Sequence, residues 1–480
     1  MKTYAYLILL PCIAAGTPAF AQSAQSTTGL EQAADAGTDI LVTANREARP
    51  ASTVGQAVTV LDTATITQRQ AVTVSDLLRQ TPGVTVTRNG GVGTATSVNI
   101  RGAESDQTVA LIDGIKLNDP SSPGGGFNFG SLLIGNIARI EVLRGAQAVL
   151  WGSQAIGGVV NLITRQPTEQ LSVNARAEGG WHETGQAFAN VSGKSGPVTR
   201  GRARIFSVYG QLAVTPIAGL TGTAGVRHDD HNIFGGATTF SGSGVYSPNG
   251  GATAFRASYS EGFKAPTLYQ LQSEYGNTAL DPERSHGWDA GVTQKALGGA
   301  VEASATYFRR NSSDLITFVS CTAPLTGVCT GKPNGTYDNI ARARAQGVEL
   351  SLLLRPVEAL TFSAAYTYLD AKNRSTGTAN FDRDLARRPD DSVTVNADYR
   401  WPFGLTTGAT ITAIGDSFDN ASNARRLDGY VVTDVRASFP LGEHVEVYGR
   451  VENVFNERYQ TIYQYGQPGR GAFGGIRLTY

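Results

Sequence analysis

Four consecutive side chains in this sequence could ligate a metal: His228, Asp229, Asp230 and His231. They end a predicted strand, in which neighbouring side chains point to opposite faces. A metal site needs its ligands to converge on one point. The pattern therefore favours a hydrated junction between a strand and a loop, and we predict neither a metal site nor a cofactor.

Two glycine-rich stretches could suggest a phosphate-binding loop, one from Gly152 to Gly158 and one from Gly219 to Gly225. Neither has the glycine spacing or the lysine of a nucleotide-binding loop. No nucleophile with a neighbouring base can be read from the sequence. We therefore predict that the chain is not an enzyme.

The start of the chain has the pattern of an export signal. A mostly apolar stretch runs from Ala5 to Ile13, and Ala19-Phe20-Ala21 matches a cleavage site. We predict a signal peptide over residues 1–21. A lipoprotein signal at Cys12 is the less favoured alternative, because Leu10-Pro11 before it matches such a signal poorly.

Two cysteines, Cys321 and Cys329, would remain after removal of the signal. An exported protein meets an oxidising compartment, so these cysteines are predicted to form a disulfide that closes a surface loop. Two free thiols are the alternative. A metal site would need more ligands than this segment offers.

The composition argues against nucleic acid as a partner. Forty basic residues balance forty acidic ones, so the formal net charge is zero. Beyond the signal, no run of about 18 apolar residues predicts a membrane-spanning helix. Fifty-seven glycines with scattered aromatic residues instead indicate a β-rich protein with tight turns.

Residues 49–166 are predicted to form a small mixed α/β domain. Thr73-Val74-Ser75-Asp76 has the pattern of a helix start, and Pro82-Gly83 would stop that helix. Asp113-Gly114 lies between two apolar stretches and predicts a hairpin turn.

From about residue 167 to residue 480 the hydrophobic period becomes two. One example is the segment in which Val393, Val395, Ala397 and Tyr399 alternate with Thr394, Asn396, Asp398 and Arg400. Such segments run for about ten residues, the length that crosses a bilayer when tilted. Their polar faces carry full charges, which suit a wet lumen better than a dry sandwich core. We predict a transmembrane β-barrel of about 16 antiparallel strands.

Several long motifs, in order, resemble the family of TonB-dependent outer-membrane receptors. They are Val98-Asn99-Ile100-Arg101-Gly102, Val109 to Gly114, Ile137 to Gly145, Trp151-Gly152-Ser153, Ala155 to Thr164, Glu261 to Leu271 and Asn453 to Tyr459. The resemblance implies that the first domain is a plug inside the barrel lumen. It also implies the outer membrane of a Gram-negative bacterium, with outer-membrane lipid around the barrel.

The resemblance assigns a role to the segment before the plug, residues 22–48. Residues 39–46 look like a TonB box, with Asp39, Ile40, Leu41, Val42, Thr43 and Ala44 as its proposed core. Such a box binds by adding a strand to the exposed sheet edge of a partner. The implied partner is TonB with its inner-membrane energising proteins. A leader with a chance β-prone stretch is the alternative.

The resemblance also implies a charge cluster that locks the plug to the barrel wall. Its predicted members are Arg101 and Arg144 on the plug and Glu261 and Glu349 on the barrel. A buried network of this kind is costly to break on one side, which suits a latch. The alternative is a set of independent charges facing the lumen.

Two plug loops are predicted to meet the substrate at their outer ends. One contains Asn89, Gly90, Gly91 and Thr94, and the other contains Asn118, Asp119, Ser121, Phe127 and Asn128. Glycines permit close approach, and amides supply orienting hydrogen bonds. Ordinary loop composition explains the same residues equally well.

The barrel departs from the family, whose members have about 22 strands around a plug. About six strands are missing after residues 193–197, together with any acidic calcium loops, so no calcium ligands are assigned. Within the family, the closest likeness is to the cobalamin transporter. We predict active transport of a scarce large nutrient, with cobalamin as the first candidate. The alternatives are a ferric-siderophore receptor and a shortened barrel that is a non-pumping pore or an inactive relic.

Overall fold

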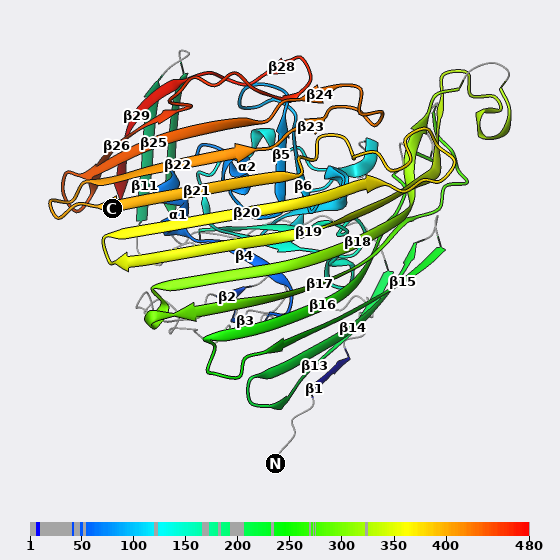
Figure 1. Ribbon diagram of the computed structural model, residues 1–480, viewed down its shortest axis with the longest axis horizontal. Coiled ribbons are helices and arrows are strands. Elements are labelled where there is room, and N and C mark those ends of the chain that lie inside the picture. The colour runs from blue at the N-terminus through cyan, green and yellow to red at the C-terminus, as the bar shows by residue number, and fades with distance from the viewer. Residues whose placement is uncertain are drawn as a thin grey trace.

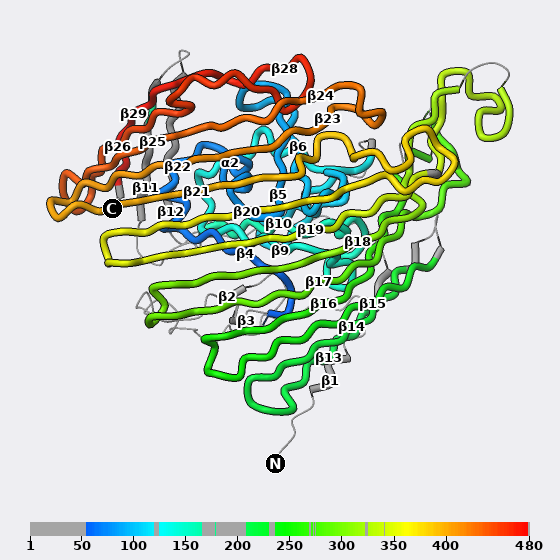
Figure 2. The backbone as a smooth tube through the Cα atoms, viewed as in Figure 1, coloured from blue at the N-terminus to red at the C-terminus, as the bar shows by residue number. Residues whose placement is uncertain are grey.

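The computed structural model describes residues 6–9, 41–42, 49–50, 54–119, 123–165, 172–180, 184–192, 206–231, 235–267, 270–271, 273, 275–321 and 325–479. These residues form a small α/β region, from residue 54 to residue 165, and a large antiparallel sheet (Figure 1). The sheet curves around the small region, as the backbone path also shows (Figure 2). We call the small region the plug and the large sheet the wall.

The plug contains two sheets and three short α-helices. The helices are α1 (Thr63–Arg69), α2 (Val74–Leu78) and α3 (Ala148–Trp151). One sheet has the order β4-β9-β10-β7-β8, with β4 (Ala57–Leu61), β9 (Ile137–Arg144), β10 (Gly158–Thr164), β7 (Thr108–Ile112) and β8 (Ile115–Lys116). The other pairs β5 (Val84–Arg88) with β6 (Thr96–Ile100). Short 3-10 turns span Ser105–Gln107, Pro123–Gly125 and Phe129–Ser131.

Local signals determine where the plug elements begin and end. Thr73 and Asp76 form a capping box, in which each side chain accepts a hydrogen bond from the other residue's backbone N–H. This confirms the predicted helix start. Asp113 and Gly114 both have positive φ, at 49° and 79°, and they join β7 to β8 as the predicted hairpin turn.

An apolar core fills the plug between its sheets and helices. Leu77 and Leu78 of α2 are buried against Val98 and Ile100 of β6, and against Val160 of β10. Burial of such side chains contributes about 1.5–3 kcal/mol each to stability. The plug therefore has its own core and docks on the wall as a folded unit.

The wall contains sixteen strands in one hydrogen-bonded order. They are β1 (Tyr6–Leu9), β13 (Phe206–Ile217), β14 (Leu220–His231), β15 (Gly235–Tyr246), β16 (Thr253–Lys264), β17 (Glu283–Ala296), β18 (Val301–Val319), β19 (Thr336–Val357), β20 (Leu360–Asn373), β21 (Asp391–Arg400), β22 (Thr406–Ile414), β25 (Tyr430–Pro440), β26 (Val445–Glu452), β29 (Gly471–Thr479), β11 (Ser172–Gly180) and β12 (Thr184–Ser192). Outside this order, three short pairs are β2 (Leu41–Val42) with β3 (Arg49–Pro50), β23 (Ser417–Phe418) with β24 (Arg426–Leu427), and β27 (Gln460–Ile462) with β28 (Tyr465–Gly466).

Alternation along the strands separates a polar inner face from an apolar outer face. In β21, Thr394, Asn396 and Asp398 are buried on the plug side. The outer faces of other strands expose large apolar side chains, including Phe240, Trp288, Leu350, Ile411 and Ile476. This arrangement, with lipid-facing and lumen-facing residues alternating, is that of a transmembrane β-barrel wall. The predicted fold class is confirmed.

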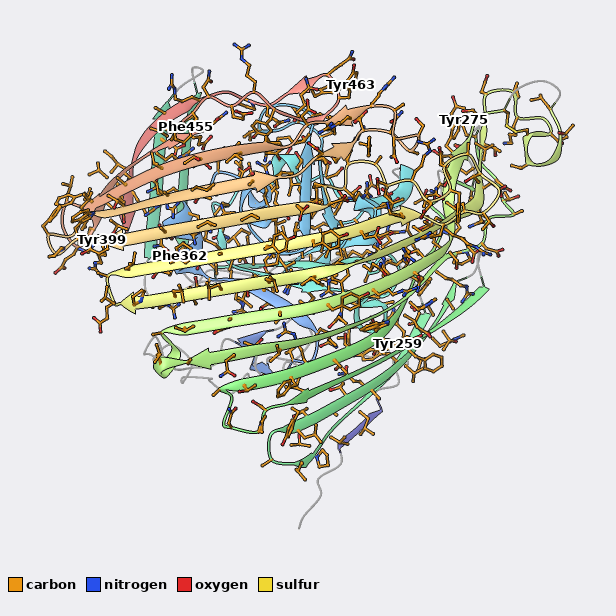
Figure 3. The ribbon with its side chains drawn as sticks, viewed as in Figure 1. Tyr259, Tyr275, Phe362, Tyr399, Phe455 and Tyr463 are labelled. Carbon is orange, nitrogen blue, oxygen red and sulfur yellow. A yellow bond between two sulfur atoms is a disulfide. The ribbon has the colours of Figure 1, made fainter. Side chains whose placement is uncertain are left out.

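Aromatic side chains occur at both ends of the wall, with Phe362 and Tyr399 toward one end and Tyr275 toward the other (Figure 3). Tyr399 and Trp401 meet edge to face, with 4.9 Å between ring centroids, at the end where short turns join the strands. The rings of Trp288 and Tyr307 lie in contact toward the end that carries the long loops, with 5.2 Å between their centroids. Aromatic side chains favour the zones where a bilayer meets water, so their occurrence at both ends fits a wall that spans a membrane. Among the residues that the structure describes, no helix has both the length and the apolar character to cross a membrane.

The wall has two free ends within the described residues. Its order begins at β1 and ends at β12, and no described ladder joins β12 to β13. Apart from β1, fifteen strands follow one another in antiparallel pairs, so β12 and β13 run in the same direction. The sequence predicted about 16 strands, but the sixteenth is β1, which lies in the predicted signal peptide and is antiparallel to β13.

Candidate functional site

The first plug–wall contact is a buried cluster around Arg101. This residue follows β6, and its Nε and Nη2 donate to the two carboxylate oxygens of Glu349 on β19, at 2.8 and 3.2 Å. Its Nη1 donates to Asp289 Oδ2 on β17 at 3.1 Å. The side chains of Arg101 and Glu349 are 4% and 3% exposed. Bidentate pairing fixes the orientation of both groups as well as their distance.

Arg144 and Gly83 complete this cluster. Arg144, at the end of β9, lies with its Nε 3.5 Å from Glu349 Oε2 and donates through Nη1 to Pro82 O at 2.9 Å. A Cβ at Gly83 would overlap the Glu349 carboxylate, so only glycine fits there. The Gly83 N–H also donates to Thr367 Oγ1 on β20, at 2.7 Å.

Burial acts on both plug arginines, with different outcomes. Burial lowers the pKa of the Arg101 guanidinium, but the carboxylates of Glu349 and Asp289 raise it more, so the net direction is upward. For Arg144, burial dominates and lowers the pKa to about 10. Both side chains remain cationic near neutral pH, because each pKa stays well above 7.

Of the four residues predicted for a lock, the structure brings together Arg101, Arg144 and Glu349 but not Glu261. The Glu261 carboxylate accepts from Tyr259 Oη at 2.9 Å and from the Phe240 N–H at 3.2 Å. The physical reason is alternation, because Glu261 shares the outer face of β16 with Tyr259. Asp289, which the sequence reasoning missed, occupies the second acidic position. Its position opposite Trp288 in an alternating strand was the available signal.

A second charged contact joins α1 to the wall. Arg69 Nη1 donates to Asp398 Oδ2 on β21 at 2.7 Å, and Arg436 on β25 pairs with the other Asp398 oxygen. All three side chains are less than a tenth exposed. Burial first, and the charge of Arg436 second, lower the pKa of Arg69 to about 10, while Asp398 opposes this shift.

A third charged contact lies toward the long-loop end. Lys264, at the end of β16, pairs with plug residue Asp106 and with Glu283 of β17. Nearby, plug residue Glu104 pairs with Arg388 in the loop after β20, at 2.8 Å. The described plug–wall ion pairs thus engage β17, β19, β21, the outer end of β16 and the loop after β20.

Around helix α3, the plug meets β13 to β16 mainly through neutral side chains, in a contact that we call the seam. Charged groups flank it, because Lys264 of β16 pairs with Asp106 and Arg227 of β14 lies beside plug residue Gly152. The narrow cavity of the seam is lined on the wall mostly by Gln211, Thr223, Ser241, Ser243, Ser258 and Ser260, and on the plug by Gln56, Ala146, Gln147, Val149 and Leu150. Helix α3 packs here. A Cβ at Gly225 would lie 3.1 Å from Val149, and one at Gly262 would lie 3.4 Å from the Ala146 Cβ. The seam therefore depends on small residues and close shape.

The first predicted substrate loop, residues 89–95, lies beside the loops of the wall. The Arg88 N–H before it donates to Thr461 Oγ1 of β27 at 3.1 Å, and Arg88 O accepts from that hydroxyl at 3.0 Å and from Gln467 Nε2 at 2.8 Å. Within the loop, Thr94 Oγ1 donates to Gly91 O at 2.8 Å. A Cβ added at Gly91 would meet open space, so the loop surface near this glycine is accessible.

Exposed aromatic and cationic side chains lie beside this loop, and the sequence reasoning missed them. Tyr463 and Tyr465, in the β27–β28 hairpin, are 40% and 49% exposed. Arg425 lies over the Tyr463 ring, 5.4 Å from its centroid. Arg425 and Tyr463 belong to different loops without periodic patterning, so no sequence signal paired them.

In the second predicted substrate loop, two amides are already used inside the plug. Asn118 donates to Thr108 O at 3.0 Å and accepts from the Ala110 N–H at 3.0 Å. Asn128 accepts from the Thr96 and Gly130 N–H groups, both at 2.9 Å. These amides therefore shape the loop. Phe127 packs edge to face on buried Phe129, at 4.9 Å.

Other predicted site residues are placed as follows. Asp119 lies at the end of a described segment, and Ser121 lies outside the described residues. Of the TonB box, Leu41 and Val42 form β2, while Asp39, Ile40, Thr43 and Ala44 lie outside the described residues. Cys321 and Cys329 form a disulfide in the loop between β18 and β19. His228 Nδ1 lies 2.9 Å from Thr238 Oγ1 on β15, whereas Asp229 pairs with Arg227.

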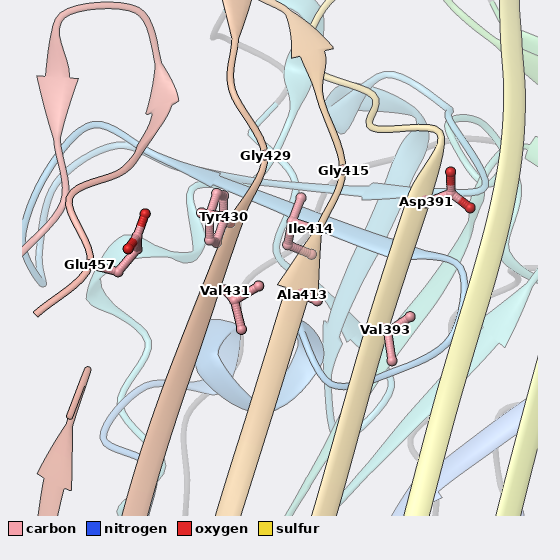
Figure 4. A pocket seen from close by; sticks show the side chains of 9 residues that line it. All are labelled: Asp391, Val393, Ala413, Ile414, Gly415, Gly429, Tyr430, Val431 and Glu457. Atoms are coloured by element: carbon pink, nitrogen blue, oxygen red, sulfur yellow. The ribbon is translucent and has the colours of Figure 1, made fainter. Parts of the chain in front are cut away.

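A shallow cavity of about 480 Å³ lies apart from the plug (Figure 4). Val393, Ala413 and Val431 line it from the outer faces of three adjacent strands, and Asp391 and Glu457 lie at its edge. Because these strands turn the same face toward lipid, the cavity belongs to the outer surface of the wall and not to the lumen.

Comparison with solved structures supports the fold. A ferric enterobactin receptor (PfeA) variant from Pseudomonas aeruginosa matches with a TM-score of 0.73 and 16% identity, over 89% of this chain and 98% of that one. The siderophore receptor PiuA from Acinetobacter baumannii matches with a TM-score of 0.68 and 13% identity, over 90% and 98%. The unliganded ferric citrate transporter FecA matches with a TM-score of 0.69 and 14% identity, over 89% and 97%.

A family model provides the assignment that fold likeness at such low identity cannot provide. The model described as TonB dependent receptor-like, beta-barrel matches residues 73–454, which is most of the chain. The matched region begins at the α2 capping box and ends after β26. With a plug docked inside a lipid-facing barrel wall, the chain belongs to the TonB-dependent receptor family of Gram-negative outer membranes.

Proposed function

We propose that this receptor takes up an iron chelate of the ferric-siderophore class across the outer membrane, driven by TonB. The observation that carries the proposal is the plug, which buried ion pairs hold across the lumen at Arg101. A docked plug suits gated transport, because a passive pore needs an open lumen. The family consists of transporters and not of enzymes.

Two observations favour an iron chelate over the cobalamin that the sequence suggested first. The solved structures with the same fold include receptors named for ferric enterobactin, ferric citrate and siderophores. In this chain, Arg425 with Tyr463 and Tyr465 forms an exposed cationic and aromatic patch beside plug loop 89–95. Such a patch suits an anionic ligand with flat aromatic groups.

The register of the plug sheet indicates where a pull from TonB would reach the charge cluster around Glu349. A pull on the TonB box would reach β4, the first plug strand, which is antiparallel to β9. The register pairs Ala57, the first residue of β4, with Arg144, the last residue of β9. A pull on the start of β4 therefore acts first on the hydrogen bonds between β4 and β9 at Arg144, which lies beside Glu349. We infer that this cluster receives the pull first and, through its buried ion pairs, holds the plug on this side of the wall.

Uptake tests the function and its substrate together. Cells without their own receptors would express this chain and receive radioiron as ferric enterobactin or ferric citrate, or labelled cobalamin. Val42→Pro in the box is the matched variant, because proline removes an N–H that strand addition needs. We expect iron uptake in the parent and background uptake in Val42→Pro, with equal amounts of both in the outer membrane.

Other outcomes separate the alternatives. Cobalamin uptake without iron uptake would restore the cobalamin interpretation. A steady single-channel conductance with no TonB-dependent uptake would identify a non-pumping pore. That alternative has a structural basis, since no described ladder joins β12 to β13.

A further inference from the structure

A buried lysine joins the plug to the wall near the long loops. Lys264, at the end of β16, is 1% exposed. Its Nζ donates to Asp106 Oδ2 of the plug at 2.9 Å and to Glu283 Oε1 of the wall at 3.1 Å. Glu283 is further held by plug residue Gln107, whose Nε2 donates to Oε2 at 2.9 Å, and by the Ile316 N–H at 3.0 Å. Lys264 thus has one acidic partner on each side of the interface.

The two acidic partners are held unequally. Glu283 is buried and uses both oxygens, whereas the Asp106 side chain is 23% exposed and its Oδ1 has no hydrogen-bond partner among the described residues. Removing Asp106 from Lys264 would leave the lysine paired with Glu283, so no isolated buried charge would result. By contrast, displacing Arg101 would leave both Glu349 and Asp289 without it. The Asp106 contact is therefore the easier one to open and close.

A glycine-rich segment of the second substrate loop lies directly on Asp106. A Cβ at Gly124 would overlap Asp106 Oδ2, and a Cβ at Gly126 would lie 3.2 Å from the Asp106 Cα. Between them, Gly125 O accepts from Gln154 Nε2 at 2.8 Å and from Asn118 Nδ2 at 3.3 Å. Because Gly124 and Gly126 both lie against Asp106, a shift of this segment would displace the Asp106 side chain.

We propose that Asp106 is a positioning residue that couples substrate contact with plug residues 124–128 to release of the plug from Lys264. The inference rests on the proposed function in one respect, namely that a substrate bound beside loop 89–95 also contacts this segment, which Asn128 joins to that loop by accepting from the Thr96 N–H. Substrate binding shifts residues 124–126, the shift separates the Asp106 carboxylate from Lys264, and Lys264 remains paired with Glu283. The plug then has one charged contact fewer when TonB pulls on it.

The proposal predicts a measurable change in the accessibility of Lys264. The full chain in detergent would be treated briefly with a water-soluble acetylating reagent, and mass spectrometry would compare Lys264 with Lys295, whose side chain is 43% exposed. Saturating ferric enterobactin should raise Lys264 labelling by about fivefold or more, in line with typical coupling energies. Lys295 should not change.

Three variants distinguish coupling from a structural role. Asp106→Ala, which removes the acceptor oxygen altogether, should raise Lys264 labelling without ligand and abolish the ligand-induced increase. Gly124→Ala should also raise the basal labelling, because its Cβ would displace Asp106. Asp113→Asn is the matched control, since Asp113 bonds within the plug, to Thr164 at 2.9 and 2.6 Å. The control should behave as the parent chain does.

The outcomes separate this inference from the proposed function. If no iron chelate binds the parent chain, the proposed substrate is wrong, but the basal labelling of Asp106→Ala and Gly124→Ala still tests the contact. Unchanged basal labelling in both variants would overturn the inference. If Lys264 stays protected from labelling in the parent chain saturated with ferric enterobactin, the inference is overturned as well.

Discussion

The plug meets the wall in two different ways. Toward β17, β19 and β21 it is held by buried ion pairs, with Arg101 on Glu349 and Asp289, and Arg69 on Asp398. Toward β13 to β16 it meets the seam, where serine, threonine and glutamine side chains surround helix α3. The same plug therefore has a charged side and a largely neutral side.

The difference matters for how the plug can move. Separating a buried ion pair exposes two charges to a poorly hydrated interface, which costs far more than exposing hydroxyl groups that water can solvate. We therefore expect the plug to remain attached longest on its charged side and to part from the wall at the seam.

The largest effect is expected from breaking the charged side at its centre. Arg101→Ala leaves Glu349 and Asp289 buried without their common partner, which should destabilise plug docking by about 3–5 kcal/mol. Urea unfolding of the plug within the intact barrel measures this free energy, and entry of a large antibiotic into cells reports the loosened plug.

Arg477→Ala is the control for this prediction. Arg477 on β29 pairs with Glu446 on β26 at 2.7 Å, within the wall, and both side chains are partly exposed. Its loss should change stability by at most about 1 kcal/mol. Equal effects of the two arginine substitutions would contradict the view that the charged side holds the plug.

A smaller effect is expected from overfilling the seam. In Gly225→Val, the new side chain would meet Val149 of α3 and Ser241 Oγ, from which a Cβ already lies 3.1 and 3.0 Å away. Overpacking of this kind should destabilise docking by about 1–3 kcal/mol in the same urea experiment. A neutral outcome would mean that the seam is looser than the structure indicates.

The pH dependence of the Asp106 contact should be smaller again. Burial raises the pKa of Asp106 to about 6, against the opposing charge of Lys264 and with a further rise from Glu283 and Glu104. A released Asp106 would titrate near 4, so between about pH 4 and 6 the docked plug holds a proton that the released plug has lost. Falling pH through this window therefore favours docking.

The labelling of Lys264 tests whether lower pH favours docking of the plug. Lys264 labelling in the parent chain, divided by that in Asp106→Ala at the same pH, should be lower at pH 5 than at pH 7.5, by less than about tenfold. Normalisation to the variant removes the pH dependence of the reagent itself. Stronger relative labelling of Lys264 at pH 5 would show that lower pH weakens docking, which is the opposite of the prediction.

The smallest effect is expected from the seam hydroxyls. Ser243→Ala and Ser260→Ala remove polar atoms from the cavity without adding volume, so docking should change by about 0.5 kcal/mol or less. The urea midpoint of the plug measures it. A loss of several kcal/mol would show that hydrogen bonding, rather than shape, holds the neutral side.

Sequence reasoning succeeded where the cause of a feature is local. The start of α2 depends on Thr73 and Asp76, three residues apart, and the β7–β8 turn depends on Asp113-Gly114 alone. The barrel class also follows from a short-range property, the period of two along each strand. By contrast, the pairing of Arg101 with Glu349 spans 248 residues, and only a family resemblance suggested it.

The errors and omissions have identifiable physical reasons. Glu261 was assigned to the lock although it alternates with Ser260 and so faces away from the plug, and Asp289 was overlooked on the inner face of the next strand. The strand count missed that β12 and β13 run in the same direction, because ladder order is not a local property. The Arg425 and Tyr463 pair joins two loops without any periodic signal.

Two engineered disulfides would test most directly whether the plug opens at the seam. Ala146→Cys with Gly262→Cys would lock the neutral side, where a Cβ at Gly262 lies 3.4 Å from the Ala146 Cβ. Gly102→Cys with Ala371→Cys would lock the charged side, where the corresponding distance is 3.1 Å. The measurement is uptake of the iron chelate by oxidised and by reduced cells. We predict that the oxidised seam lock abolishes uptake and that reduction restores it, while the charged-side lock retains most of it. Full uptake through the oxidised seam lock would contradict the account.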